Sequence, residues 1–171
     1  DMLISLGLMN GDGYVYKERQ KKFRQINKFL EMVADVADRL PENPHILDFG
    51  CGKSYLTFGL YYYLKVILNK DVNITGVDLK KDVVDFGNNL AGKCGFEHLK
   101  FIHGDVADFP SEKRWDMMVT LHACDTATDY ALGFAVKNGT GIILSVPCCQ
   151  HELFYQVENE LLQPMLKHGI L

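Results

Sequence analysis

The residues best suited to chemistry in this chain are an aspartate at the end of a short apolar run and two glycines just after it. The run Ile46–Phe49 contains Asp48, and Gly50 and Gly52 follow, two residues apart. Glycine tolerates backbone dihedral angles forbidden to other residues and lets a ligand approach the backbone closely. A strand, a tight turn and a helix in this order form the layout of a site for a nucleotide-type cofactor.

The spacing around Gly52 separates three cofactor classes. A phosphate-binding P-loop needs a glycine five residues earlier, where this chain has Leu47, and a dinucleotide fingerprint needs a small residue three positions later, where it has Tyr55. The remaining pattern, Asp-x-Gly-x-Gly-x-Ser from Asp48 to Ser54, resembles motif I of class I S-adenosylmethionine-dependent methyltransferases. This resemblance implies S-adenosyl-L-methionine as the cofactor and a methyltransferase activity.

Apolar strands alternate with helices along the chain, which predicts a parallel sheet covered on both faces. We expect an α/β, Rossmann-like, doubly wound and mostly parallel sheet. It forms one domain over 1–171, in which a helix over 17–40 precedes the cofactor-binding core at 45–171. The last residues of the sequence, 168–171, resemble a turn that enters a sixth strand. The sheet is therefore predicted to be truncated before its last strands. The predicted strands are 45–49, 72–77, 99–103, 115–120 and 141–146, and the predicted later helices are 55–68, 81–94, 126–136 and 152–167.

Acidic residues at three strand ends are suited to the cofactor that the resemblance implies, because ligands of such sheets bind beyond the carboxyl ends of the strands. Aspartate and glycine are also ordinary loop residues, so one match alone would mean little. Asp78 is placed to accept hydrogen bonds from the ribose hydroxyls, and Asp105 to bind the adenine amino group, with Leu79 and Val106 packed on the ring. The full predicted cofactor set is Asp48, Gly50, Cys51, Gly52, Asp78, Leu79, Asp105, Val106 and Leu121.

Two later segments, 121–129 and 146–152, follow the fourth and fifth predicted strands and should converge beside the transferable methyl group. The pair is similar to the methyltransferase module of glutathione S-transferase C-terminal-domain-containing proteins. It also resembles, more weakly, a tRNA ribose 2′-O-methyltransferase family, through Ala127-Thr128-Asp129 and Cys148-Cys149. The chain departs from that second family at Ala123, Asp125 and Gln150. This resemblance implies an RNA acceptor, and small-molecule and protein acceptors stay open as alternatives.

His122, Asp125 and Cys148 are the predicted catalytic residues. His122 could act as a general base, because an unperturbed imidazole titrates near neutral pH. Asp125 or Asp129 could orient this base or the acceptor. Alternatively, Asp125 could only cap the following helix and His122 could only pack near the cofactor. Cys148 follows a proline, as does the nucleophile of pyrimidine C5-methyltransferases, which leaves covalent catalysis on a pyrimidine ring as an alternative function.

A metal site is the other interpretation of the histidines and cysteines in these two segments, which have the ligand types that zinc prefers. Their spacing lacks the usual pairing of cysteines two to four residues apart, so no metal ligand is predicted. A non-catalytic module that binds S-adenosylmethionine or metal remains an alternative to the enzyme. The histidines and cysteines of this alternative metal site are His122, Cys124, Cys148, Cys149 and His151.

The charge pattern bears on partners and location. The net charge of −4 argues mildly against a dedicated nucleic-acid-binding protein, yet the predicted helix at 17–40 begins with a basic cluster that could bind an RNA backbone. The same run could be a solvated helix face, or Lys22 or Gln25 could reach the cofactor carboxylate. Five cysteines without a disulfide-like spacing and no apolar run of membrane-spanning length predict a cytoplasmic protein; oligomeric state is left open. The basic cluster is Lys17, Arg19, Lys21, Lys22, Arg24 and Lys28.

Overall fold

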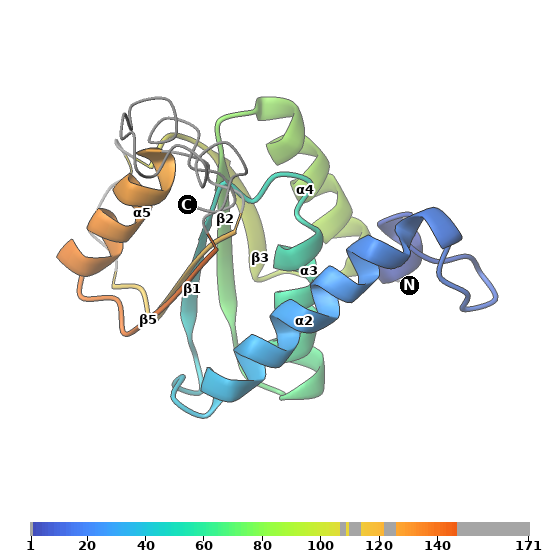
Figure 1. Cartoon of the computed structure of the whole chain (residues 1–171), viewed down its shortest axis with the longest axis horizontal. Helices are drawn as coiled ribbons and strands as arrows, with labels where there is room; N and C mark the ends of the chain where they lie inside the picture. Colours follow the sequence, from blue (N-terminus) through green and yellow to red (C-terminus); the bar gives the residue numbers. More distant parts are fainter. Residues whose placement is uncertain (1, 107–108, 110–113, 122–125, 147–171) are drawn as a thin grey trace, which may run out of the picture.

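Five parallel strands form one sheet at the centre of the protein. The computed structural model describes residues 2–106, 109, 114–121 and 126–146. The strand order is β3-β2-β1-β4-β5, so the order reverses beside β1 (Figure 1). This arrangement confirms the predicted Rossmann-like α/β fold. The strands are β1 (His45–Phe49), β2 (Asn73–Asp78), β3 (Leu99–His103), β4 (Met117–Thr120) and β5 (Ile142–Ser145).

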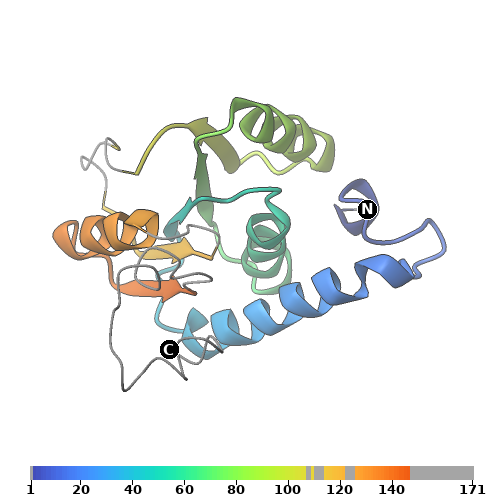
Figure 2. The ribbon, with the colours of Figure 1, turned by 45° about the horizontal axis from the view of Figure 1, so that its top comes forward.

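The described helices cover both faces of this sheet. Helices α2, α3 and α4 lie on one face, and α5 lies on the other (Figure 2). The chain begins with α1 at one end of the molecule and then crosses the sheet through α2. The bounds are α1 (Met2–Ser5), a 3₁₀ turn η1 (Lys17–Arg19), α2 (Gln20–Ala37), α3 (Tyr55–Tyr62), a π-helical turn η2 (Tyr63–Ile67), α4 (Lys81–Cys94) and α5 (Thr126–Lys137).

Strand β1 shows why the sheet is buried on both faces. Its side chains alternate between the two sides, as the pleat of a strand requires. Ile46 belongs to the apolar core under α2, α3 and α4, whereas Leu47 and Phe49 belong to the core under α5. Strand β1 pairs with β2 on one edge and with β4 on the other, and the helices cover both of its faces, so all of its apolar side chains are buried.

Several predicted boundaries match the structure, and others shift for local reasons. Strands β1 and β3 and helix α4 have the predicted bounds. The helix predicted over 17–40 starts as a 3₁₀ turn and ends at Ala37, and the one predicted over 55–68 becomes π-helical after Tyr62. Strand β4 starts at Met117 rather than Trp115; just before it, the Asp116 side chain, instead of a backbone carbonyl, accepts the hydrogen bond from the His45 N–H. The helix predicted over 152–167 lies outside the described residues.

Two close approaches set the packing of the helical face. Helix α2 crosses α3 at Gly59, where an added Cβ would lie 3.0 Å from the Ile26 side chain. The Phe101 ring fits between Gly76 of β2 and Gly87 of α4. Among the described residues, no helix combines the length and apolar character needed to cross a membrane.

Candidate cofactor site at the switch point of the sheet

The turn after β1 is held in a left-handed conformation that exposes its backbone. The φ angles are 68° at Gly50, 53° at Gly52 and 59° at Ser54. Glycine adopts such angles without strain, whereas Ser54 does so at a cost and is fully buried. The Ser54 hydroxyl donates to the Gly52 carbonyl at 3.1 Å, and the Gly50 N–H donates to the Val77 carbonyl at 2.8 Å. The turn is therefore tied both to itself and to β2.

Asp78, at the end of β2, links this turn to the start of α4. One carboxylate oxygen accepts a hydrogen bond from the Gly52 N–H at 2.9 Å, and the other accepts one from the Lys80 N–H at 2.9 Å. Each carboxylate oxygen has two lone pairs, so both can accept a further bond. Asp78 thus shapes the turn and still offers acceptors to a ligand.

The loops after β2 and β3 form the opposite wall. The His103 Nε2–H donates to the Leu79 carbonyl at 2.9 Å, which fixes the protonated nitrogen of the ring, since a carbonyl oxygen can only accept. This bond holds the backbone of Leu79 while its side chain stays 65% exposed. Asp105 and Val106 follow on the neighbouring loop. Leu79, Asp105 and Val106 all line the same cavity, so these two loops supply both apolar and acidic side chains to it.

A cavity of about 520 Å³ opens between these loops, at the point where the strand order reverses. Six of the nine predicted cofactor residues line it. The sequence prediction did not include the remaining lining residues, which come from the end of β1, the turn after it, the end of β2, the loops after β2 and β3, the first turn of α4 and the start of α5. The lining residues are Phe49, Gly50, Gly52, Lys53, Val77, Asp78, Leu79, Lys80, Asp82, Val83, Gly104, Asp105, Val106 and Ala127.

The other three predicted cofactor residues do not line this cavity. Leu121 is 8% exposed and belongs to the apolar core. Cys51 is buried behind the turn, and burial, with a further contribution from the charge of Asp48, raises the pKa of its thiol far above the ordinary value. Cys51 is therefore a neutral thiol at physiological pH. Asp48 is 4% exposed and lies beneath the turn.

Asp48 supports the site from within the core. The Thr57 hydroxyl of α3 donates to its Oδ2 at 2.6 Å. Burial, and to a smaller extent the charge of Asp78, raises the pKa of Asp48 to about 7, although the Thr57 bond acts in the opposite direction. A carboxyl group that is largely protonated below neutral pH suits a buried position, since burying a charge is costly.

We expect the elevated pKa of Asp48 to make the folded state less stable as pH rises. The pKa is about 7 in the folded state against 3.8 unfolded, so the folded state binds more protons between these values. Stability therefore falls with rising pH, and this group contributes a loss of about 1.4 kcal/mol between pH 6 and pH 8. Chemical denaturation at a series of pH values measures this change in the free energy of unfolding.

Asp48→Asn provides the matched comparison, because asparagine has nearly the same shape and does not titrate. The variant should lose this part of the pH dependence while other groups continue to titrate. Parallel curves of unfolding free energy for the two proteins between pH 6 and pH 8 would contradict the raised pKa.

The predicted catalytic residues His122, Asp125 and Cys148 lie outside the described residues, as do Cys124, Cys149 and His151 of the alternative metal site. Of their described neighbours, Ala127 in the first turn of α5 lines the cavity, whereas Leu121, which follows β4, belongs to the core. Among the described residues there is no group of three or more histidine, cysteine, aspartate and glutamate side chains arranged to hold a metal ion.

Comparison with solved structures supports the fold assignment. The S-adenosylmethionine-dependent methyltransferase from Thiobacillus denitrificans, in complex with S-adenosyl-L-homocysteine, is 22% identical over 70% of this chain and 47% of its own, with a TM-score of 0.54. The corresponding protein from Geobacter sulfurreducens, also with S-adenosyl-L-homocysteine, is 20% identical over 70% and 47%, with a TM-score of 0.53. The chain thus spans about half the length of these structures.

At sequence identities of 22% and 20%, the likeness to these two structures shows a shared fold and nothing more. No curated protein matches the chain in sequence. The sequence does match the family described as "Methyltransferase domain" over residues 21–156, which include the turn, Asp78 and Asp105. This match covers most of the chain, from α2 to beyond β5. The chain therefore belongs to the methyltransferase-domain family.

Proposed function

We propose that this chain binds S-adenosyl-L-methionine in the switch-point cavity and transfers its methyl group to an acceptor. The observation that carries the proposal is the position of Asp78, whose carboxylate is anchored to Gly52 and Lys80 and still has lone pairs for two ribose hydroxyls. The cavity volume of about 520 Å³ lies within the range of about 300–1,000 Å³ usual for such ligands. Leu79 and Val106 offer apolar contact to a purine ring.

The chemistry that the cofactor supplies is an electrophilic methyl group on a sulfonium ion. The contribution of the chain is to hold and orient both partners and to exclude water. The turn at Gly50 and Gly52 allows close backbone approach. We propose that His122 removes the acceptor proton and that Asp125 orients His122, because both come just before the first turn of α5 in the sequence, and Ala127 of that turn lines the cavity. Cys148 would serve instead as a nucleophile if the acceptor were a pyrimidine ring.

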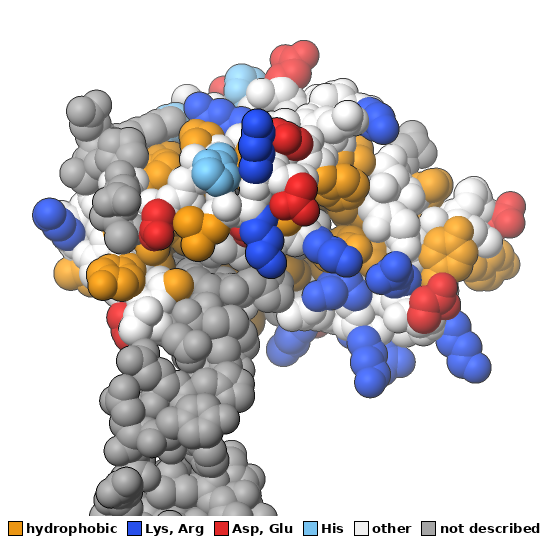
Figure 3. Space-filling view, turned by 90° about the horizontal axis from the view of Figure 1, so that it is seen from above, with side chains coloured by type: hydrophobic (Ala, Val, Ile, Leu, Met, Phe, Trp, Pro, Cys, Tyr) orange, Lys and Arg blue, Asp and Glu red, His pale blue; other side chains and the backbone are white. Residues whose placement is uncertain are grey.

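RNA is the acceptor class that we propose. The segment from Lys17 to Lys28 contains six basic residues and one acidic residue, Glu18. Just before it, Tyr14 is 73% exposed and Tyr16 43% exposed. Exposed aromatic rings beside cations suit single-stranded RNA, which binds through base stacking and phosphate contacts. Figure 3 shows lysine and arginine side chains gathered on the right-hand half of the face seen from above.

Reversing charges on this helix tests the acceptor. We expect Lys21→Glu with Arg24→Glu to weaken binding of a mixed single-stranded RNA pool and to lower its methylation from labelled S-adenosylmethionine. The loss should exceed about tenfold at low salt, because the lost phosphate contacts would be replaced by repulsion. Filter binding at several salt concentrations and incorporation of the label give the two readouts.

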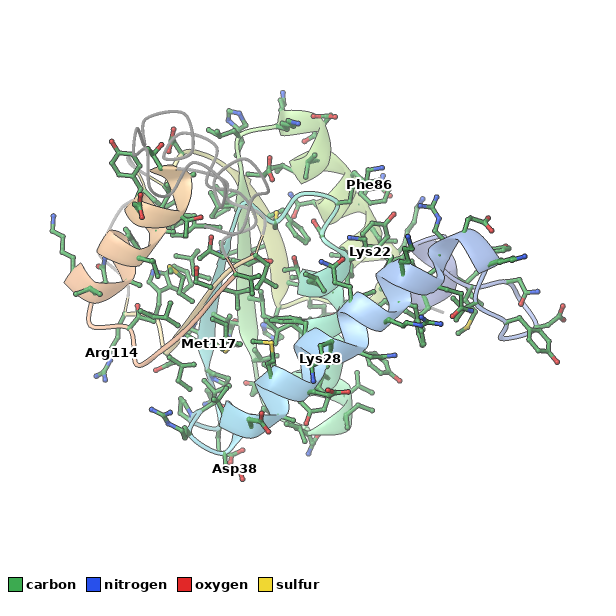
Figure 4. All side chains as sticks on the ribbon, in the orientation of Figure 1. Lys22, Lys28, Asp38, Phe86, Arg114 and Met117 are labelled. Atoms are coloured by element: carbon green, nitrogen blue, oxygen red, sulfur yellow. The ribbon has the colours of Figure 1, made fainter. Side chains whose placement is uncertain are left out.

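Arg114→Glu with Lys137→Glu is the matched control. It makes the same change in net charge at exposed positions away from the basic start of α2, and Figure 4 shows Arg114 on the opposite side of the molecule from Lys22. This variant should bind and methylate RNA as the unaltered chain does. Equal losses of RNA binding and methylation in both variants would show a general charge effect. Methylation of proteins or small molecules but not of RNA would refute RNA as the acceptor. The substitution His122→Ala in the same methylation assay tests whether His122 is the general base.

A further inference from the structure

The basic residues at the start of α2 fall on two different sides of the helix. An α-helix turns by about 100° per residue, so Lys21, Arg24 and Lys28 project from one side, opposite the buried Ile26 and the rest of the core-facing stripe. Lys21, Arg24 and Lys28 are accordingly exposed. By the same geometry Lys22 projects toward the core side, and it is only partly exposed. Lys22 therefore faces the protein rather than bulk solvent.

A second cavity, of about 280 Å³, lies where this side of the helix meets the turn after β1. Three cationic residues and no acidic residue line it. Figure 4 shows Lys22 on the part of α2 beside α3. The cavity shares Gly52 and Lys53 with the switch-point cavity, so the two adjoin. Its lining residues are Arg19, Lys22, Cys51, Gly52, Lys53, Ser54 and Tyr55.

Neutral groups hold Lys22 in place. Its Nζ donates to the side-chain oxygen of Gln25 at 2.7 Å and lies 5.7 Å from the centre of the Tyr55 ring. An ammonium group has three donors, so donors remain for a ligand. Within the described part of the chain, the ion pairs shorter than 4.0 Å involve other lysines: Lys28, Lys65 and Lys70. The cavity thus combines an oriented cation with two more cations and no neutralising carboxylate in its lining.

We propose that Arg19, Lys22 and Lys53 form an oxyanion subsite that binds the methionine carboxylate of S-adenosylmethionine. The inference rests on the proposed use of that cofactor. A ligand whose ribose lies at Asp78 and whose methionine end passes Gly52 reaches the second cavity, because both cavities are lined by Gly52. The carboxylate is the only negative charge of the cofactor. An RNA phosphate would instead meet Lys21 and Arg24 on the exposed side of α2.

Paired ligands isolate the carboxylate. S-adenosyl-L-homocysteine carries both the amine and the carboxylate, whereas S-adenosyl-3-thiopropylamine keeps the amine and lacks the carboxylate. We expect calorimetry on the 171-residue chain to show tighter binding of the first ligand. Lys22→Gln and Lys53→Gln should each weaken binding of the homocysteine ligand by about tenfold or more, because hydrogen bonds to charged groups contribute strongly. Binding of the carboxylate-free ligand should change by less than about twofold.

Lys21→Gln is the matched control, since it removes the same charge from the neighbouring position on the exposed side, and it should leave both affinities unchanged within about twofold. Thermal melting checks that every variant is folded. Equal weakening of both ligands by Lys22→Gln would overturn the inference, because it would mean that this lysine only supports the turn. If Lys22→Gln weakened RNA binding and left binding of the homocysteine ligand unchanged, the inference would also be overturned, because the subsite would then bind an acceptor phosphate. If the unaltered chain binds neither ligand, the proposed cofactor itself is refuted.

Discussion

Asp78→Ala is expected to abolish measurable binding of S-adenosyl-L-homocysteine while the protein remains folded. The substitution removes the acceptor of the Gly52 and Lys80 N–H groups, so the turn loses its tie to the end of β2. It also removes the proposed acceptor of two ribose hydroxyls. Hydrogen bonds to charged groups contribute about 1.5–3 kcal/mol each, so two of them correspond to a loss of more than about 100-fold in affinity. Isothermal titration calorimetry measures it.

The matched control is Asp85→Ala, which removes a carboxylate from an exposed position of α4 outside the lining of the cavity. It should bind the ligand normally. Asp78→Asn separates charge from shape, because the amide keeps one oxygen acceptor. We expect its affinity to lie between those of the unaltered chain and Asp78→Ala. Unchanged affinity in Asp78→Ala, with melting temperatures showing a folded protein, would contradict the proposed ribose contact.

Gly76→Ala is expected to give the largest loss of stability. An added Cβ would lie 2.5 Å from Cδ1 of Phe101 and 3.2 Å from Sγ of Cys51. The ring cannot simply withdraw, because a Cβ added to Gly87 on the α4 side would already lie 2.7 Å from it. Phe101 also stacks on Phe58, with ring centres 5.7 Å apart. Overpacking of this kind costs about 1–3 kcal/mol, and we expect the upper end because the contact is closed on several sides.

Gly92→Ala tests whether the cost comes from the contact rather than from the loss of a glycine. Gly92 is exposed in the same helix as Gly87, and no atom lies within 4 Å of an added Cβ. We expect it to stabilise α4 by about 0.5–1 kcal/mol, because alanine restricts the unfolded chain and favours helix. Combining Gly76→Ala with Phe101→Leu should recover part of the loss. Urea denaturation compares the variants, and equal stabilities of Gly76→Ala and Gly92→Ala would refute the packing argument.

The sequence by itself determined the elements and their order. Apolar runs of four to six residues between helical stretches predicted the strands, and β1, β3 and α4 have the predicted bounds because local periodicity and turn residues specify them. A parallel sheet then places the carboxyl ends of its strands along one edge. For that reason Asp78 and Asp105 could be assigned to one site from their positions after two strands. The structure brings both to the same cavity.

Tertiary structure decided which chemical groups face the ligand. The sequence shows Asp48 as part of the turn motif, but only the packing of α3 on β1 buries it against Thr57 and raises its pKa. Likewise, the basic residues of α2 form one cluster in the sequence. The crossing of α2 over α3 brings Lys22 into the same cavity lining as Lys53, 31 positions later in the chain, and leaves Lys21 in solvent. Local patterns encode the period of an element, whereas contacts between distant segments depend on how those elements pack.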